Sequence, residues 1–417
     1  MNPSPIHKCL KIVYTKTPDN FLLALTIAAI LVMARFKSDV FTDPVVQAFG
    51  HPRILTTGLF LVAISVIVHM LQRPRKVYLI DYACFRPTHH NRAPYATFVE
   101  HVRQISFFIC SYINVYKYCT LEAGREEAQL VVFSAIDDLL AKTNIAPVTI
   151  DVLVVNCSGF SPTPSFPDMI VNKYKMLSDI HSVHLSGMGC SAGLISIELA
   201  KNLLQAMPHV LLSTSPTKAR FRLKCLVRTL TGASDNSYKC IHQEEDDKGH
   251  TGINLSKDLM VVAGATLKAN ITTIAPLILP ASEKLRFVLS FISRKLLRMK
   301  TKLYVPNFLA AVKHICIHAG GRAVIDEIQC SLGLSDEQVE PSRMTLHRFG
   351  NISSNSLWYE MAYIEAKLRM HRGDRLWMIG FGSGFKCNSA VWECINPAHI
   401  EDGPWASCIH RYPVHIP

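Results

Sequence analysis

A cysteine inside a glycine-rich turn is the first group in this sequence whose type and setting suit chemistry. Residues 185–193 read Leu-Ser-Gly-Met-Gly-Cys-Ser-Ala-Gly, and we predict a strand over 182–185 before the turn and a helix over 191–207 after it. Cys190 then lies at or near a helix N-terminus, where unpaired N–H groups and the helix dipole favour the thiolate. This setting indicates a nucleophile. A buried structural cysteine is the alternative.

Two histidines four residues apart, His314 and His318, resemble a zinc pair. A shared ion would need both rings on one helical face, but the intervening Ile-Cys-Ile predicts a strand. On a strand the two rings stand about 13 Å apart, so we predict no metal site. His318 ends this strand before a turn into a helix over 323–329, which is where parallel sheets bind ligands. His314 is predicted to be a hydrogen-bonded core residue.

A third segment combines polar side chains and glycines. Asn351 follows His347 and precedes a helix, so an ordinary turn or cap residue is the alternative to a functional one. Gly380, Gly382 and Gly384 follow a predicted strand, but the G-x-G-x-G spacing does not match a dinucleotide fingerprint. These glycines instead predict close approach of the backbone to a site.

Alternating strands and helices are expected to position these residues. Short apolar runs predict strands over 77–81, 151–155 and 375–379, and helical periodicity marks 126–142, 260–267 and 356–370. The run 151–155 is typical of a strand buried on both faces of a sheet. The alternation predicts an α/β fold, with a change between two comparable halves near residues 225–240.

Two long apolar runs precede this body. Residues 21–36 and 54–71 approach or reach the roughly 18 residues that a spanning helix needs. The short linker between them contains two prolines and a glycine, which predicts a transmembrane hairpin with both flanks in the cytosol. Two buried core helices are the alternative.

A second basic region covers residues 281–302, with seven lysines and arginines against one glutamate. Its apolar residues follow helical spacing. A basic amphipathic helix on an anionic membrane and an ordinary solvated helix are both compatible with this pattern. No nucleic-acid motif accompanies the charge, so we predict no nucleic-acid partner.

The composition further limits the class of protein to which this chain can belong. Hydrophobic residues make up 49% of 417 residues, which excludes intrinsic disorder. The net charge of +12 suits an anionic partner such as a membrane surface or a phosphorylated substrate. The 13 cysteines are too sparse and irregular for a disulfide framework and indicate reduced thiols.

Several long runs together resemble the plant 3-ketoacyl-CoA synthases, the condensing enzymes of very-long-chain fatty-acid elongation. The runs are residues 77–87, 169–176 and 382–392, besides the Cys190, His318 and Asn351 segments and the apolar N-terminus. The resemblance covers nearly the whole chain. It implies a thiolase-like αβαβα layered fold of two similar halves, and we divide the chain into a membrane anchor (1–76), a half with the nucleophile (77–225) and a half with His and Asn (226–417).

The resemblance also implies roles. Cys190, His318 and Asn351 stand at the positions of the family's catalytic Cys-His-Asn set, and His314 and His347 match supporting histidines. Cys190 would accept an acyl chain, and decarboxylation of malonyl-CoA would supply the carbon nucleophile. The expected substrates are acyl-CoA and malonyl-CoA, with no metal or redox cofactor. We expect the Cys190 sulfur within about 4 Å of a His318 ring nitrogen.

The same resemblance implies an endoplasmic reticulum membrane protein with its catalytic body facing the cytosol. A homodimer and a complex with the elongase reductases and dehydratase are the expected partners. A polyketide synthase-like enzyme is the alternative within the fold, although such an enzyme would need no anchor. A non-catalytic partner in an elongase complex is the alternative from another class.

Two departures from the family pattern favour that last alternative. After His209 the chain passes at once to Val210, where the family carries roughly forty further residues that would help to build the sheet beside the nucleophile. Leu230 stands where the family usually has histidine. The gap resembles a skipped exon or a faulty gene model, and a true short isoform is the other explanation.

Overall fold

The computed structural model describes residues 76–87, 120–206, 219–245, 251–295, 304–397 and 403–416. All of them belong to one compact unit, residues 76–417. The predicted spans 21–36 and 54–71 lie outside the described residues.

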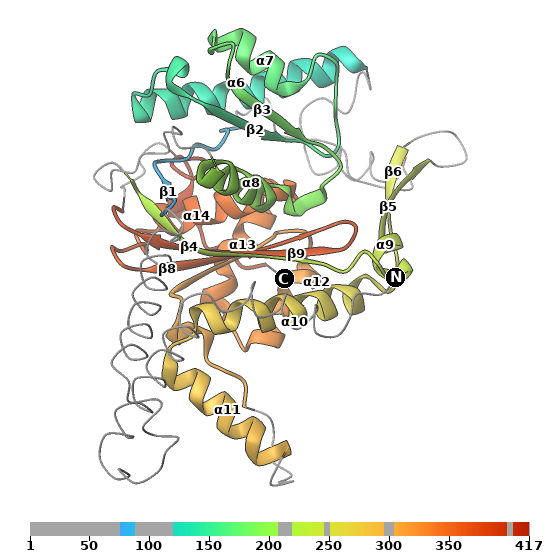
Figure 1. Ribbon diagram of the computed structural model, residues 1–417, viewed down its shortest axis with the longest axis vertical. Coiled ribbons are helices and arrows are strands. Elements are labelled where there is room, and N and C mark those ends of the chain that lie inside the picture. Colours follow the sequence, from blue (N-terminus) through green and yellow to red (C-terminus); the bar gives the residue numbers. More distant parts are fainter. Residues whose placement is uncertain are drawn as a thin grey trace, which may run out of the picture. The chain divides into compact units, whose positions relative to one another are not determined.

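The described chain alternates helices and strands, as the apolar runs predict (Figure 1). The helices are α6 (Leu121–Thr143), α7 (Phe166–Tyr174), α8 (Ala192–Ala206), α9 (Asp235–Lys239), α10 (Leu259–Ile278), α11 (Ala281–Lys295), α12 (Arg322–Leu332), α13 (Asp336–Phe349) and α14 (Ser356–Ala366). The strands are β1 (Tyr78–Leu79), β2 (Val152–Asn156), β3 (His181–Leu185), β4 (Phe221–Leu230), β5 (Ile241–Glu245), β6 (Thr251–Leu255), β7 (His314–Ile317), β8 (Arg375–Gly382) and β9 (Lys386–Cys394).

These elements stack in five layers (Figure 1). Helices α6 and α7 cover the parallel pair β2–β3, and α8 and α14 lie between this pair and a five-stranded sheet of order β1-β4-β9-β8-β7. Helices α10 and α12 cover the outer face of that sheet. The predicted αβαβα layering is therefore present in the described residues.

The five-stranded sheet divides the core into two parts because side chains alternate along each strand. On β8, Trp377 and Ile379 face the cluster formed with α10 and α12, whereas Leu376 and Met378 face the cluster formed with α14. All four side chains are fully buried, as expected for a sheet covered on both faces.

The strand predicted to be buried on both faces, 151–155, differs from this pattern. It forms β2 (Val152–Asn156), but every residue of β2 is only half-buried. Among the described residues β2 pairs with β3 alone, so this sheet has two strands against five in the other. The two halves are therefore unequal in the described chain, and the boundary drawn at residue 225 falls inside β4.

Other helices and strands differ from their predicted bounds mainly in length. Residues 77–81 supply only the two-residue strand β1, which pairs with β4. Helix α10 extends eleven residues past the predicted end at 267, with Pro276 near its C-terminus. Helix α14 ends at Ala366, four residues before the predicted end, and Leu368 then adopts a left-handed φ of 55°.

One described helix, α10, is long and apolar enough to cross a membrane by length and composition. It packs instead against β4 and β9 and contributes several side chains to the core. Such helices also occur inside globular bodies, and we interpret α10 as a core helix.

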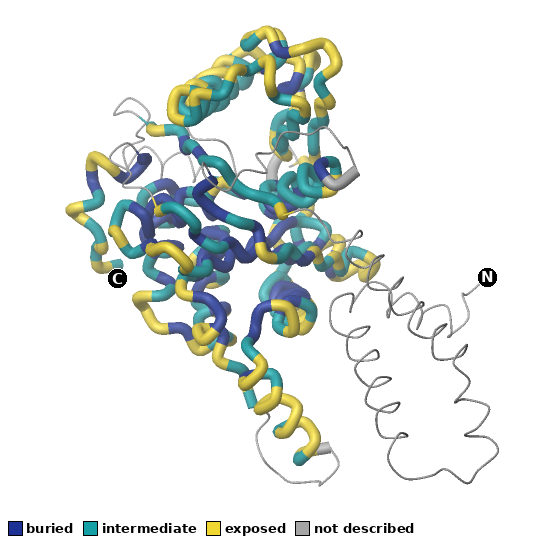
Figure 2. The backbone as a smooth tube through the Cα atoms, turned by 60° about the vertical axis from the view of Figure 1, so that its left-hand side comes forward, coloured by how far each residue is buried: buried dark blue, intermediate teal, exposed yellow. Residues whose placement is uncertain are grey.

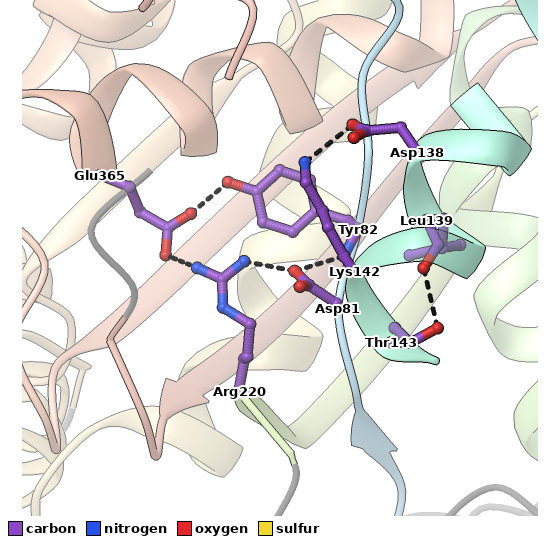
Figure 3. Close-up of polar contacts among 8 residues, drawn as sticks. All are labelled: Asp81, Tyr82, Asp138, Leu139, Lys142, Thr143, Arg220 and Glu365. Atoms are coloured by element: carbon purple, nitrogen blue, oxygen red, sulfur yellow. Dashed lines mark hydrogen bonds and ion pairs between the residues drawn. The ribbon is translucent and has the colours of Figure 1, made fainter. Parts of the chain in front are cut away.

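A buried ion cluster joins the start of the body to its centre. Arg220 lies between Asp81 and Glu365, and the Tyr82 hydroxyl also donates to Glu365 (Figure 3). The Arg220–Asp81 contact is 2.5 Å. Burial raises the pKa of Glu365, while Arg220 opposes that shift. The cluster ties the segment around β1 to β4 and α14.

Removing the cation from this cluster should destabilise the body strongly. We expect Arg220→Met to lower the free energy of unfolding by about 3–5 kcal/mol, because it leaves the buried Glu365 carboxylate unpaired. Arg222→Met is the matched control two residues along β4: its pair with Glu393 is partly exposed, and its loss should cost under about 1 kcal/mol. Urea unfolding of both variants in detergent measures the difference. An equal loss of unfolding free energy in the two variants would contradict this prediction.

Candidate functional site

Cys190 lies in a short 3-10 turn, Gly189–Ser191, that leads directly into helix α8. The backbone N–H of Gly189 donates to the Ser158 hydroxyl at 2.9 Å, so the segment after β2 holds the turn. Gly189 has a φ of +70°, a conformation that favours glycine. The predicted helix-terminal position of the cysteine agrees with this geometry.

The glycine turn after β8 packs against this cysteine turn. A Cβ added to Gly382 would come within 2.5 Å of the Ser191 Oγ, and one added to Gly189 within 2.6 Å of the Ser383 Oγ. A Cβ on Gly380 would approach Leu194 of α8 at 3.2 Å. The two backbones approach each other as closely as the glycines permit. Gly384, with a φ of +101°, completes the turn between β8 and β9.

The pKa of the Cys190 thiol differs from the expectation that the helix terminus favours the thiolate. Burial raises the pKa of the thiol, and a hydrogen bond with the Ser353 side chain only partly opposes the shift. Desolvation thus outweighs the helix terminus in the resting state. A neutral thiol needs a base to become a nucleophile.

His318 follows β7 directly and is 4% exposed. Its Nδ1 lies 3.0 Å from the Ser356 hydroxyl. Burial lowers the pKa of the ring to about 4, although a hydrogen bond with the Ser353 backbone works against this. His318 is therefore neutral at physiological pH. Nε2 lies beside Gly320, where an added Cβ would come within 2.9 Å.

Asn351 joins the turn after His318 to its own loop through backbone groups. Its Nδ2 donates to the Gly320 carbonyl at 3.2 Å, and its Oδ1 accepts from the Ser353 N–H at 3.0 Å. These contacts hold Ser353 in a left-handed conformation with a φ of 56°. Asn351 thus also performs the turn-forming role that its position before a helix suggested.

Ser353 is the common neighbour of the three predicted residues. Its N–H donates to Asn351, and its carbonyl accepts from the Ser356 hydroxyl, which lies 3.0 Å from Nδ1 of His318. Its side chain is one of the groups that lower the pKa of the Cys190 thiol against the effect of burial. Sequence reasoning did not select it, although it lies in the serine-rich run 353–356 beside Asn351. The expected separation of about 4 Å between the Cys190 sulfur and a His318 nitrogen remains a prediction.

A second serine from the same run connects the two sheets. Ser354 donates to Asn156 at the end of β2 at 3.2 Å, and Asn156 donates to Ser196 of α8 at 3.1 Å. The carboxyl end of β2 and the helix after the cysteine are therefore linked to the Asn351 loop. None of these three groups stood out in the sequence.

The remaining histidines contact other groups. His314 begins β7, at the opposite end from His318, and its Nε2 lies 3.2 Å from Asp374. This position agrees with a hydrogen-bonded core histidine and with the strand that separates the two rings. His347 is exposed near the end of α13, and its ring contacts Tyr412. Both histidines are thus bonded away from the Ser353 turn.

The depressed pKa of His318 should appear in the stability of the protein. An unfolded histidine binds a proton near pH 6.5, whereas the folded ring does so only near pH 4. The unfolded chain therefore holds more protons in this window, and stability falls as pH falls from 6.5 to 4, by up to about 3 kcal/mol. The denaturation midpoint, measured at a series of pH values, should therefore fall between pH 6.5 and 4. We expect His318→Gln to remove the part of this fall that the buried ring causes.

His347→Gln is the control, because it leaves the buried ring at 318 in place and should keep the wild-type slope. Identical slopes for His318→Gln and the wild type would contradict the burial argument.

Comparison with known proteins assigns this arrangement to a family. A model described as FAE1/Type III polyketide synthase-like protein matches residues 69–112, 107–212 and 208–296, and one described as 3-Oxoacyl-[acyl-carrier-protein (ACP)] synthase III C terminal matches 309–394. 3-Ketoacyl-CoA synthase 6 of Arabidopsis thaliana is 48% identical over 88% of this chain and 87% of the relative. 3-Ketoacyl-CoA synthase 5 of the same plant is 44% identical over 98% and 97%.

The chain belongs to the 3-ketoacyl-CoA synthase family. Solved structures agree at the level of fold alone. The type III polyketide synthase 1,3,6,8-tetrahydroxynaphthalene synthase of Streptomyces coelicolor aligns with a TM-score of 0.52 at 18% identity, over 66% of this chain and 80% of that one. The C-terminal domain of Steely1 from Dictyostelium aligns with a TM-score of 0.50 at 15% identity, over 77% and 100%.

The alignments also show that this chain is shorter than its family relatives internally. The match to 3-ketoacyl-CoA synthase 5 runs over 479 positions, while 98% of 417 residues is about 409, so about 70 positions have no residue here. The family model breaks at 107–112 and at 208–212. The second break coincides with the junction where the sequence departs from the family pattern.

Proposed function

We propose that this chain is built for the condensing reaction of very-long-chain fatty-acid elongation, with Cys190, His318 and Asn351 as its catalytic residues. The observation that supports the proposal is that the loop after Asn351 meets both of the other segments: Ser356 lies 3.0 Å from Nδ1 of His318, and a Cβ added to Gly193, three residues after Cys190, would lie 3.3 Å from Ser354. The reaction joins an acyl-CoA to malonyl-CoA. It needs no metal or redox cofactor, because both substrates are already activated thioesters.

The first step is acyl transfer to Cys190. The neutral His318 ring is a base that can accept the thiol proton at Nε2 while Nδ1 stays bonded to the Ser356 hydroxyl. The sulfur then attacks the acyl-CoA carbonyl carbon, and the carbon–sulfur bond to CoA breaks. The proton passes to the departing CoA sulfur, so an acyl-cysteine and free CoA result.

The second step is decarboxylation and condensation. Loss of carbon dioxide from malonyl-CoA leaves an enolate, whose oxygen needs hydrogen-bond donors. Nδ2 of Asn351 has two N–H groups, and only one is needed by Gly320. The Ser356 hydroxyl donates to the Ser353 carbonyl at 3.0 Å, so it accepts from Nδ1–H of His318 and leaves Nε2 as the base of the first step. To donate to the enolate, His318 needs the other tautomer, with its proton on Nε2. The carbanion then attacks the acyl thioester and releases a 3-ketoacyl-CoA and the Cys190 thiolate.

The same proposal includes the membrane in which the reaction takes place and the proteins that take part in it. The apolar runs 21–36 and 54–71 would anchor the chain in the endoplasmic reticulum membrane, with the body in the cytosol. A homodimer and an association with the reductases and dehydratase of elongation are part of the proposal. The family relatives support the chemistry, and the anchor and partners rest on sequence pattern.

A specific observation favours a second candidate function. Strand β2 is half-buried throughout, and the first two residues of β3 are exposed. Together with about 70 unmatched alignment positions, this weak burial favours a weakly active chain that acts as a partner in an elongase complex. The polyketide synthase-like alternative has only the likeness of fold, at 18% identity.

Intact-mass spectrometry tests the proposed chemistry directly. The purified chain is incubated with a long-chain acyl-CoA, and the expected result is one added acyl group that peptide mapping assigns to Cys190. Addition of malonyl-CoA should then discharge the acyl group as a product two carbons longer. Stable acylation with no discharge would favour the partner role, and no acylation of Cys190 would reject the catalytic assignment.

A further inference from the structure

Helix α11 exposes an aliphatic face to solvent, while two polar side chains on its other side are bonded to the segment 304–307. Leu285, Val288, Leu289 and Ile292 follow the i, i+3, i+4, i+7 spacing of one helical face. They are 59%, 47%, 56% and 39% exposed. In Figure 1 the helix projects from the body below α10, and most of it is exposed in Figure 2.

The opposite side of α11 is held by polar contacts. Glu283 is 5% exposed, and its Oε2 accepts hydrogen bonds from the Tyr304 hydroxyl at 2.7 Å and the Asn307 N–H at 2.8 Å. The Ser290 hydroxyl accepts from the Tyr304 N–H at 2.9 Å. These donors lower the pKa of Glu283, so the carboxylate stays charged. The helix is therefore anchored in this orientation, which is the reverse of an ordinary surface helix.

The charge of this segment identifies the partner of the apolar face. Lys284 flanks that face on α11, Arg286 pairs with Glu283 at 3.4 Å, and Arg294, Lys295 and three more basic residues carry the positive charge from the end of the helix to residue 302. Two copies of the chain packed through this face would bring these positive charges together. An anionic lipid surface offers the opposite charge together with an apolar interior.

We propose that α11 is an interfacial helix that docks the body of the protein on an anionic lipid bilayer. Its four aliphatic side chains enter the boundary between headgroups and acyl chains, and its basic residues contact lipid phosphates. At about 1.5 Å per residue its 15 residues lie along roughly 22 Å of membrane surface. This contact is separate from the N-terminal apolar runs, and it would fix one side of the body against the membrane.

Fluorescence quenching tests this contact in the full-length chain. Leu289→Trp puts a reporter on the apolar face, and Leu121→Trp puts one on α6 at the same 56% exposure. Each variant is reconstituted into vesicles of phosphatidylcholine with phosphatidylserine whose acyl chains carry bromine. After subtraction of the four native tryptophans, we expect Leu289→Trp to lose at least about half of its fluorescence and Leu121→Trp very little.

A second set of experiments tests whether the contact between α11 and lipid requires opposite charge. Vesicles of phosphatidylcholine alone, or the additional changes Lys284→Glu and Arg294→Glu, should reduce the quenching of Leu289→Trp at least about threefold. Equal quenching of the two reporters, or failure of the chain to associate with anionic vesicles, would overturn the proposal. Shielding of Leu289→Trp that depends on protein concentration and not on brominated lipid would also overturn it, because a protein would then cover the face.

Discussion

Replacing Cys190 by alanine should abolish acyl-enzyme formation and lower 3-ketoacyl-CoA production by at least about 10³-fold. The reason is that the thiol is the only group of the Ser353-centred site that can form a thioester. The fold should persist, because the Cys190 side chain is only partly buried and alanine is the smaller residue. Intact-mass spectrometry and a radioactive malonyl-CoA assay measure the two effects.

Two other cysteines serve as controls for this change. Cys330 is exposed, so Cys330→Ala reports any non-specific acylation of accessible thiols. Cys157 is half-buried and follows β2, close in sequence to Ser158, which holds the nucleophile turn. Both variants should keep the wild-type acyl group at Cys190. If Cys190→Ala still becomes acylated while Cys330→Ala or Cys157→Ala does not, the nucleophile is the cysteine that is replaced in that control.

The three candidate residues could be selected from the sequence because the setting of each is local. A cysteine in a glycine-rich turn, a histidine at a strand end and an asparagine before a helix each follow from a few adjacent residues. Ser353 could not be selected in this way. Its role comes from a left-handed backbone conformation and from contacts with Cys190 and His318, which are 163 and 35 residues distant in sequence.

The thiol pKa shows a second limit of sequence reasoning. The helix terminus and its dipole were visible in the sequence, and they favour the thiolate. Burial depends on segments far away in the chain, and it raises the pKa of Cys190 instead. The same effect lowers the pKa of His318 and keeps its ring neutral. Two opposing effects on one group cannot be weighed before the packing is known.

The fold could be predicted to the level of its layers, but the burial of β2 could not. An apolar run such as 151–155 reports what a strand prefers to bury, and the neighbouring strands decide what it does bury. In the described chain β2 has one partner strand, so its valines and leucine are only half-buried. The orientation of α11 could not be read from periodicity either, because periodicity identifies an apolar face without saying which way it points.

The largest gain in activity should come from restoring the segment that this chain lacks after His209. We expect the chain as it stands to elongate at least about tenfold less than a version that carries the corresponding segment of 3-ketoacyl-CoA synthase 6 between residues 209 and 210. The nucleophile turn must be held within about 0.5 Å of its working geometry by its packed neighbours. Here the turn depends on Ser158, after β2, and β2 belongs to a sheet of only two described strands.

The loss of a strand should also lower the stability of the sheet beside Cys190. A missing sheet strand leaves unpaired backbone groups that cost about 1–3 kcal/mol each where they are buried. A domain has only about 5–15 kcal/mol of stability, so a few such groups would loosen the sheet that supports Cys190. Leu230, where the family usually has histidine, is 60% exposed at the end of β4, so its effect should be smaller than that of the segment.

Both forms should be expressed in cells that lack endogenous elongation, and very-long-chain fatty acids measured at matched protein levels. The restored chain with Cys190→Ala is the control that ties the output to this site. Output from the restored form alone means that the catalytic residues are sound and their support is deficient. Equal output from both forms means that the β2–β3 pair holds the nucleophile turn without further strands, and the half-buried strands would then be a tolerated feature of a working enzyme.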